Sequence, residues 1–133
     1  MSLADYFYTK YINYSYESNL NLARSNYKTL CSLVGSSETT QLLTIIAGAN
    51  GGVSERKYRG MIDITNDRAS YGMVASLAKD MHTPYMVKRV CNMFSRSQET
   101  QTLAISFIYF FASFTGQFTF EDDEMVDYIL GVK

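Results

Sequence analysis

The spacing of its apolar residues constrains the fold of this chain more than any other feature. Residues 20–34, 42–49 and 74–81 place apolar side chains at three- and four-residue steps, which gathers them on one face of a helix. No stretch sustains the alternation that is typical of a strand. The only proline, Pro84, follows a threonine that can cap a helix, so it marks a helix start rather than a break. The sequence therefore predicts an all-α fold of about seven or eight helices.

Hydroxyl residues directly before the apolar stretches predict where helices begin, because their side chains can accept a hydrogen bond from the first helical turn. These predicted caps are Ser54, Thr83, Ser97 and Thr119. We expect Gly35 to end one helix and Ser36 or Ser37 to cap the next. The helix after Ser97 is apolar around much of its circumference, so it is predicted to be the central and most buried one.

Length and charge exclude several classes of protein. The 133 residues fit one domain, 1–133, and a net charge of −1 gives no overall attraction for nucleic acid. Cys31 and Cys91 are too few for a disulfide framework or a zinc site, and we expect inert core thiols. The longest apolar stretch, residues 103–114, is shorter than the ~20 residues that span a bilayer. Without a secretory signal, the expected location is cytoplasmic, and peripheral membrane association stays open.

Two segments of the chain align when it is shifted by 65 residues. Residues 43–54 and 108–119 each end an apolar helix with an alanine, a small residue and a polar-glycine turn. In both, an apolar residue (Val53 or Phe118) then precedes the hydroxyl cap of the next helix. Duplication and convergence on the same corner chemistry both explain the match. Either way, we expect two related helical hairpins, 37–67 and 98–131, packed about a pseudo-two-fold axis.

The first corner reads Ala47-Gly48-Ala49-Asn50-Gly51-Gly52-Val53-Ser54. This pattern resembles the TerB-like (tellurite resistance protein B-like) helical domain over residues 42–64 and, more loosely, 105–130. The resemblance implies an all-helical domain of similar length with two such corners. It also implies a link to stress-response and membrane-associated assemblies, and metal binding by acids near the corners. The chain departs from the pattern where Asn50 and Thr115 stand in place of the acid usual in the turn.

The one dense run of charge is Glu121-Asp122-Asp123-Glu124. Glu121 and Glu124 share a helix face, so with Asp122 they are the candidate ligands for a divalent cation. The alternative is that acids simply favour the first turn of a helix, where the dipole stabilises them. Asn50-Gly51-Gly52 is interpreted as a turn rather than a phosphate loop, and Arg56-Lys57-Arg59 as charges on a solvated face.

Tyrosines are concentrated before residue 17. They are Tyr6, Tyr8, Tyr11, Tyr14 and Tyr16. Tyrosine buries a large area and keeps a polar end, so this Tyr-rich segment, 1–17, is a candidate interface arm. Packing over the core of the same chain is the alternative.

The sequence favours a non-catalytic, TerB-like binding or scaffolding module whose partner is another protein or a second copy. A divalent cation is the only cofactor considered. The first alternative is a structural or accessory protein of a phage or mobile element. The second is a small metal-dependent hydrolase using Glu121 and Asp122, with the lone histidine, His82, as a candidate base.

Overall fold

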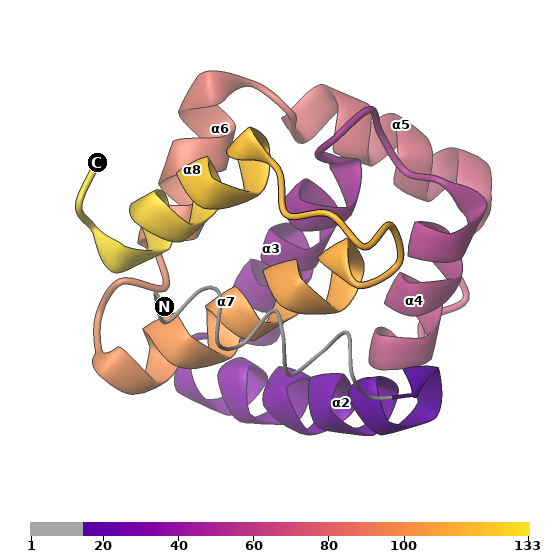
Figure 1. Cartoon of the computed structure of the whole chain (residues 1–133), viewed down its shortest axis with the longest axis horizontal. Helices are drawn as coiled ribbons and strands as arrows, with labels where there is room; N and C mark the ends of the chain where they lie inside the picture. The colour runs from indigo at the N-terminus through magenta and orange to yellow at the C-terminus, as the bar shows by residue number, and fades with distance from the viewer. Residues whose placement is uncertain (1–14) are drawn as a thin grey trace.

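The computed structural model describes residues 15–133, and within them it contains seven helices and no strand (Figure 1). The helices are α2 (Tyr16–Leu33), α3 (Ser36–Gly48), α4 (Glu55–Thr65), α5 (Tyr71–Met81), α6 (Pro84–Asn92), α7 (Gln98–Ala112) and α8 (Phe120–Leu130). The predicted all-α fold is confirmed. Within this part of the chain, no helix combines the length and apolar character needed to cross a membrane.

A cap was predicted for five of the seven helix starts in the described part of the chain, and four of these predictions are confirmed; the caps of α2 and α5, Ser15 and Ser70, were not predicted. The side chains of Ser54, Thr83, Ser97 and Thr119 each accept a hydrogen bond from the backbone N–H three residues later. The prediction of Ser36 or Ser37 as a cap is wrong, because α3 already begins at Ser36 and Gly35 precedes it without a side-chain cap. Gly35 has φ +139°, a conformation that favours glycine, and this allows α2 and α3 to join with almost no loop.

Helix α7 is the centre of the domain, as predicted. Ten of its fifteen residues are buried, and it packs against α2, α3 and α8. In Figure 1 it runs through the middle of the molecule, with α2 below it and α8 above. The phenylalanines of α7 fill this centre, and Phe107 and Phe110 have no exposed surface. Burial of such large side chains contributes about 1.5–3 kcal/mol each.

The helix contacts have a two-fold pattern. Helices α3 and α4 form one hairpin and α7 and α8 another, and α3 also packs against α7. Helix α2 packs on α4 and α7, while α6 packs on α8 and α3. Exchanging α2, α3 and α4 with α6, α7 and α8 leaves these pairings unchanged, but the contact of α2 with α3 has no equally extensive counterpart between α6 and α7. Helix α5 has no counterpart in this exchange and packs on the outside, against α3 and α4.

A glycine permits the close approach of α4 to the aromatic end of α7. A Cβ atom on Gly60 would lie 3.1 Å from the ring of Phe114 and 3.2 Å from that of Phe110. The two rings also contact each other edge to face, with centroids 5.1 Å apart. The absence of a side chain at position 60 therefore leaves room for these two rings against α4.

Replacing Gly60 with leucine should lower the free energy of unfolding by about 1–3 kcal/mol, because the new side chain must displace packed rings. Arg59→Leu, at an exposed position of the same helix, should change it by less than about 0.5 kcal/mol. Urea unfolding followed by circular dichroism measures both. Equal effects of the two substitutions would contradict the close packing at Gly60.

Candidate functional site

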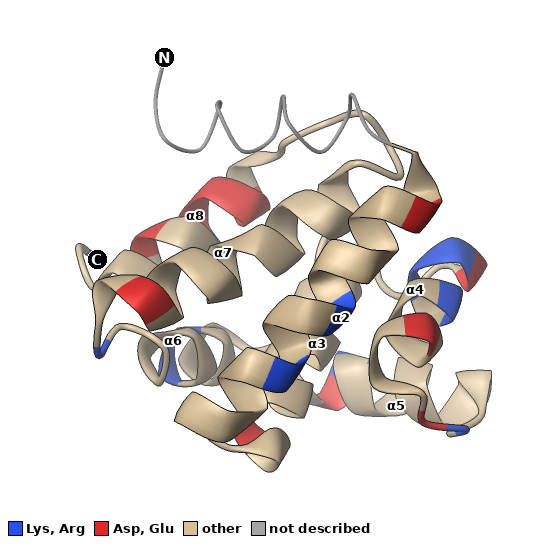
Figure 2. Ribbon diagram, turned by 90° about the horizontal axis from the view of Figure 1, so that it is seen from below, with Lys and Arg blue, Asp and Glu red and all other residues tan. Residues whose placement is uncertain are grey.

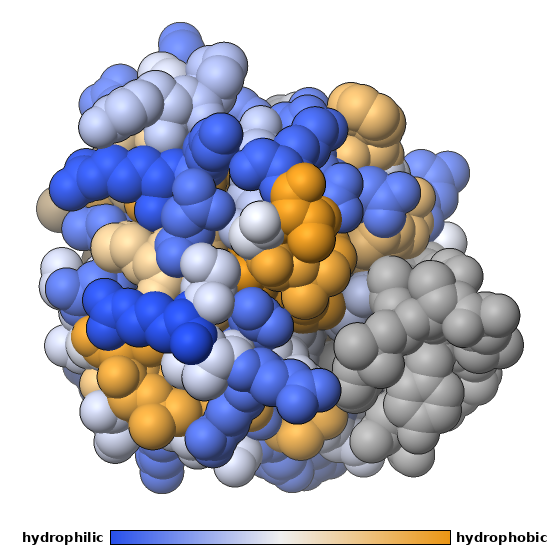
Figure 3. Space-filling model, turned by 90° about the vertical axis from the view of Figure 1, so that its left-hand side faces the viewer, coloured by the Kyte–Doolittle hydropathy of each residue, from blue (hydrophilic) through white to orange (hydrophobic). Residues whose placement is uncertain are grey.

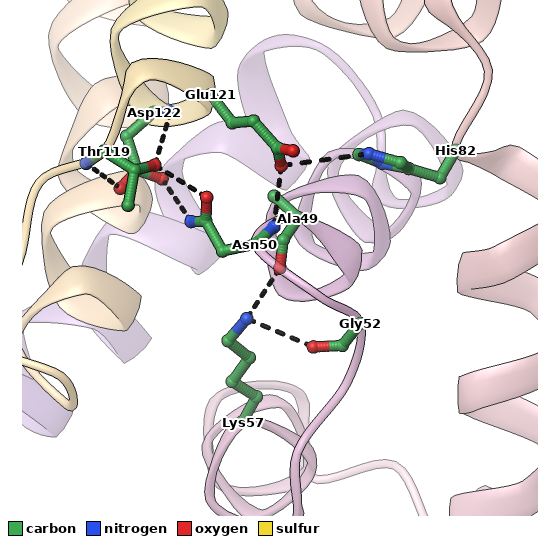
Figure 4. A network of polar contacts seen from close by, with 8 residues as sticks. All are labelled: Ala49, Asn50, Gly52, Lys57, His82, Thr119, Glu121 and Asp122. Carbon is green, nitrogen blue, oxygen red and sulfur yellow. Dashed lines mark hydrogen bonds and ion pairs between the residues drawn. The ribbon is translucent and has the colours of Figure 1, made fainter.

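The turns of the two hairpins meet, and Asn50 joins them (Figure 4). Its backbone N–H donates to Glu121 Oε2 at 2.7 Å, and its Nδ2 donates to Asp122 Oδ1 at 3.1 Å. Its Oδ1 accepts from the hydroxyl of Thr119 at 2.6 Å. Asn50 holds φ +59°, a left-handed conformation that asparagine tolerates better than most residues. One residue of the first corner thus contacts three residues of the second.

Asp122 lies at the centre of this junction. Its Oδ2 accepts from the backbone N–H of Thr119 at 2.9 Å, while its own N–H donates to the Thr119 hydroxyl, which completes a capping box. Only 3% of Asp122 is exposed. Both carboxylate oxygens accept hydrogen bonds from the chain, so this acid serves the helix start and the junction together.

Lys57 is the second buried charge of the junction. It was expected on a solvated face, and that expectation is wrong, because only 8% of it is exposed. Its ammonium group donates to the backbone oxygens of Ala49 at 2.7 Å and Gly52 at 3.1 Å (Figure 4). These carbonyls lie where α3 ends and the turn begins, and Lys57 supplies donors for them.

The two buried charges influence each other. Burial lowers the pKa of Lys57, and the negative charges of Asp122 and Glu121 oppose that shift. Burial raises the pKa of Asp122, while the hydrogen bonds from Thr119 and Asn50 and the charge of Lys57 oppose the rise. In both groups desolvation is the largest cause of the pKa shift. Burying the two charges therefore costs free energy, and their hydrogen bonds partly offset that cost.

The 65-residue shift relates these two charges. Lys57 is the third helical residue after its cap, Ser54, and Asp122 is the third after Thr119. The first copy of the repeat therefore has a buried cation at this position, and the second copy has a buried anion at the equivalent position. A cavity of about 340 Å³ lies beside them and is lined by both turns.

The three predicted metal ligands turn to different partners. Asp122 is occupied by the capping box, whereas Glu121 Oε2 lies 3.9 Å from Nε2 of His82 and Glu124 lies 3.6 Å from the ammonium of Lys133. In residues 15–133, no group of three or more His, Cys, Asp or Glu side chains is arranged to hold a metal ion. The structure does bring Glu121 and Glu124, without Asp122, to one small pocket of about 220 Å³, which His82 also lines.

A larger groove lies on the outer side of α4. Its volume is about 580 Å³, and its lining residues are Glu55, Tyr58, Arg59, Ile62, Asp63 and Tyr71. The rings of Tyr58 and Tyr71 meet edge to face with centroids 5.5 Å apart. Their hydroxyls donate to the backbone oxygens of Ala69 and Val53, both within 2.7 Å, so both rings are held in place.

Of the predicted tyrosine interface, the structure describes Tyr16 alone, and Tyr6, Tyr8, Tyr11 and Tyr14 lie outside the described residues. The ring of Tyr16 packs on Phe110 and Phe114, and its hydroxyl donates to Asp63 Oδ2 at 2.7 Å. Burial and this bond to a carboxylate raise the pKa of Tyr16 to about 12. Tyr16 therefore packs on the core of its own chain while part of its surface stays exposed.

The cysteines divide between two environments. Cys91 has no exposed surface, and burial raises the pKa of its thiol to about 12, so it stays protonated and inert as predicted. Cys31 is only half-buried.

Sequence reasoning missed Lys57 and the bridging role of Asn50. A sequence signal for the burial of Lys57 was present, because a shift of 65 residues aligns it with Asp122. Opposite charges at equivalent inward positions of the two segments indicate a pair. Nothing in the local pattern separated Lys57 from its exposed neighbours Arg56 and Arg59, because all three follow a helix cap. The role of Asn50 depends on how the two hairpins dock, which the local sequence does not encode.

Comparison with protein-family models, curated proteins and solved structures gave no match to this chain.

Removing either buried charge should destabilise the fold. Asp122→Ala leaves the Thr119 N–H and the Asn50 amide without an acceptor and should cost about 2–4 kcal/mol in unfolding free energy. Lys57→Met leaves two carbonyl groups without a donor and should cost about 1–3 kcal/mol. Chemical denaturation measures both variants.

Matched controls are Asp123→Ala, which removes an exposed acid from the same helical turn, and Lys28→Met on the exposed face of α2. Each should change the free energy by at most about 1 kcal/mol. The double variant Lys57→Met/Asp122→Ala should lose less than the sum of the single losses, since the two charges interact. Strict additivity would contradict the coupling of the two positions.

Proposed function

We propose that this chain is a non-catalytic helical binding module that takes a segment of a partner protein in the groove on α4. The observation that carries the proposal is the chemistry of the groove. Tyr58, Tyr71 and Ile62 give the groove aromatic and aliphatic lining, and Glu55, Arg59 and Asp63 add charges of both signs to it. Apolar linings that carry polar groups are typical of sites that bind protein segments.

The side chains and the helix that line the groove are held by contacts within the chain. The hydroxyls of its two tyrosines are fixed by backbone acceptors, and α4 is anchored at its start by Lys57 and in its middle by the approach of Gly60 to α7. A fixed surface loses little conformational entropy on binding, which favours affinity. The partner segment that fits would carry an aromatic or aliphatic side chain flanked by charges of both signs, to match Arg59 and Asp63.

The proposal includes the resemblance of the chain to the TerB-like domain. Its support is the pair of related corners, each with a glycine turn and a hydroxyl cap, and their meeting at Asn50. Acids at such corners are implicated in metal binding in that family. Here Lys57 instead supplies a positive charge from within the chain, so the corners are held together by the chain's own side chains.

Peptides selected from a random library against the folded chain test the groove. Selected peptides should shift the NMR resonances of α4 and the start of α5, and Arg59→Glu or Ile62→Asp should weaken their binding about tenfold. Lys88→Glu on α6 serves as the control and should leave binding unchanged. Peptides that bind another surface, or a library that gives no binder, would overturn the proposal.

A second candidate function is divalent-cation binding at the pocket lined by His82, Glu121 and Glu124. An imidazole with two carboxylates suits Zn²⁺, but the three side chains are not arranged as ligands in this structure. Ligation would require them to converge, with Glu124 leaving Lys133. Isothermal titration should then give heat with Zn²⁺ that is lost in His82→Ala and retained in Asp123→Asn. An absence of heat with the unmodified chain would exclude this candidate and also the metal-dependent hydrolase, which needs the same ion.

A further inference from the structure

Helix α5 carries an exposed apolar pair that the groove does not use. Met73 is 68% exposed and Leu77 is 51% exposed, and they lie one turn apart on one flank of the helix. Tyr71 belongs to the other flank, where it packs against Tyr58 of α4. The small side chain of Ser76, also exposed, lies beside Met73 and Leu77 and would allow another helix to approach closely.

The close spacing of Met73 and Leu77 on one helix flank differs from the spacing of the exposed leucines on α2. On α2, Leu22 and Leu33 are eleven positions apart. Figure 3 views the side of α6 and α8, where exposed apolar residues form separate patches among polar ones. The pair on α5 stands instead on a helix that packs within the domain on α3 and α4, and its outer flank remains open.

Charges flank the apolar pair at both ends of α5, and Figure 2 shows no charged residue between them. Asp67 and Arg68 precede the helix, and Lys79 and Asp80 lie in its last turn. All four side chains are exposed, and none of them forms an ion pair within residues 15–133.

Two of these charges, Arg68 and Asp80, are self-complementary. If two copies of α5 lie antiparallel, the N-terminal end of one meets the C-terminal end of the other. Arg68 of one copy then lies near Asp80 of the second, and Asp80 shares the helix flank of Met73 and Leu77. Lys79 lies on the opposite flank, beside Tyr71 and Ala75, and takes no part in this contact. A register within about two residues of this Arg68–Asp80 pairing, or about 3 Å along the helix, places Met73 of one copy against Leu77 of the other. A parallel alignment would instead place each charge beside its own kind.

We infer that the occupant of this surface is a second copy of the chain, bound through α5 in an antiparallel, two-fold symmetric dimer. Such an interface is isologous, so each contact occurs twice. An eleven-residue helix is only about 16 Å long, which gives a contact below the standard size of stable interfaces. The dimer is therefore expected to be weak, with a Kd on the order of micromolar or above.

Sedimentation equilibrium of the full chain over a wide concentration range tests the dimer. The unmodified chain should show a reversible monomer–dimer equilibrium, and Leu77→Glu should abolish it. Arg68→Glu and Asp80→Arg should each weaken association about tenfold or more, since each substitution replaces two attractive pairs with two repulsive ones. The double variant Arg68→Glu/Asp80→Arg should restore it, because the pairs re-form with the signs exchanged.

Leu33→Glu on α2 is the matched control, because it places the same charge on an exposed leucine away from α5 and should leave the dimer intact. Circular dichroism of every variant checks that the fold is retained. A strictly monomeric chain at the highest concentration, or a double variant that fails to recover, would overturn the inference. Since Met73 and Leu77 lie outside the groove, Arg59→Glu should not change association, and the two proposals can fail independently.

Discussion

The contact on which the rest of the structure depends is the docking of two helical turns through buried polar groups. Asn50 spans the two turns, and Lys57 and Asp122 supply opposite charges on either side of it. Burying these groups is unfavourable by itself, so their hydrogen bonds require a defined geometry. An apolar contact of the same size would tolerate sliding, whereas this one sets the relative position of α4 and α8 and hence the side of the domain on which the groove opens.

Most of the fold could be predicted from the sequence because its signals are local. The apolar spacing gives the helices, and the hydroxyl residues at 54, 83, 97 and 119 give their starts. The error at Gly35 is also local: a serine was preferred as a cap, but the chain needed a residue with positive φ to turn directly from α2 into α3. Burial around α7 followed from its composition.

The candidate sites were less accessible to sequence reasoning, because each is formed by residues that meet only in the folded chain. Glu121 was predicted to act with Asp122, but docking turns it toward His82 and Asn50. The groove joins Tyr58 of α4 to Tyr71 of α5, and neither tyrosine stands out in its own segment. Lys57 differs from Arg56 and Arg59 only in the direction that its side chain faces. In a helix of eleven residues, packing against the neighbouring helices decides which face is buried.

The opposite charges of Lys57 and Asp122 also make the two hairpins non-interchangeable. A chain made of the first hairpin repeated twice would bury two lysines at the junction, and one made of the second would bury two aspartates. Like charges withdrawn from water repel strongly, so neither symmetric chain would hold its turns together. However the two halves arose, each is now fitted only to the other.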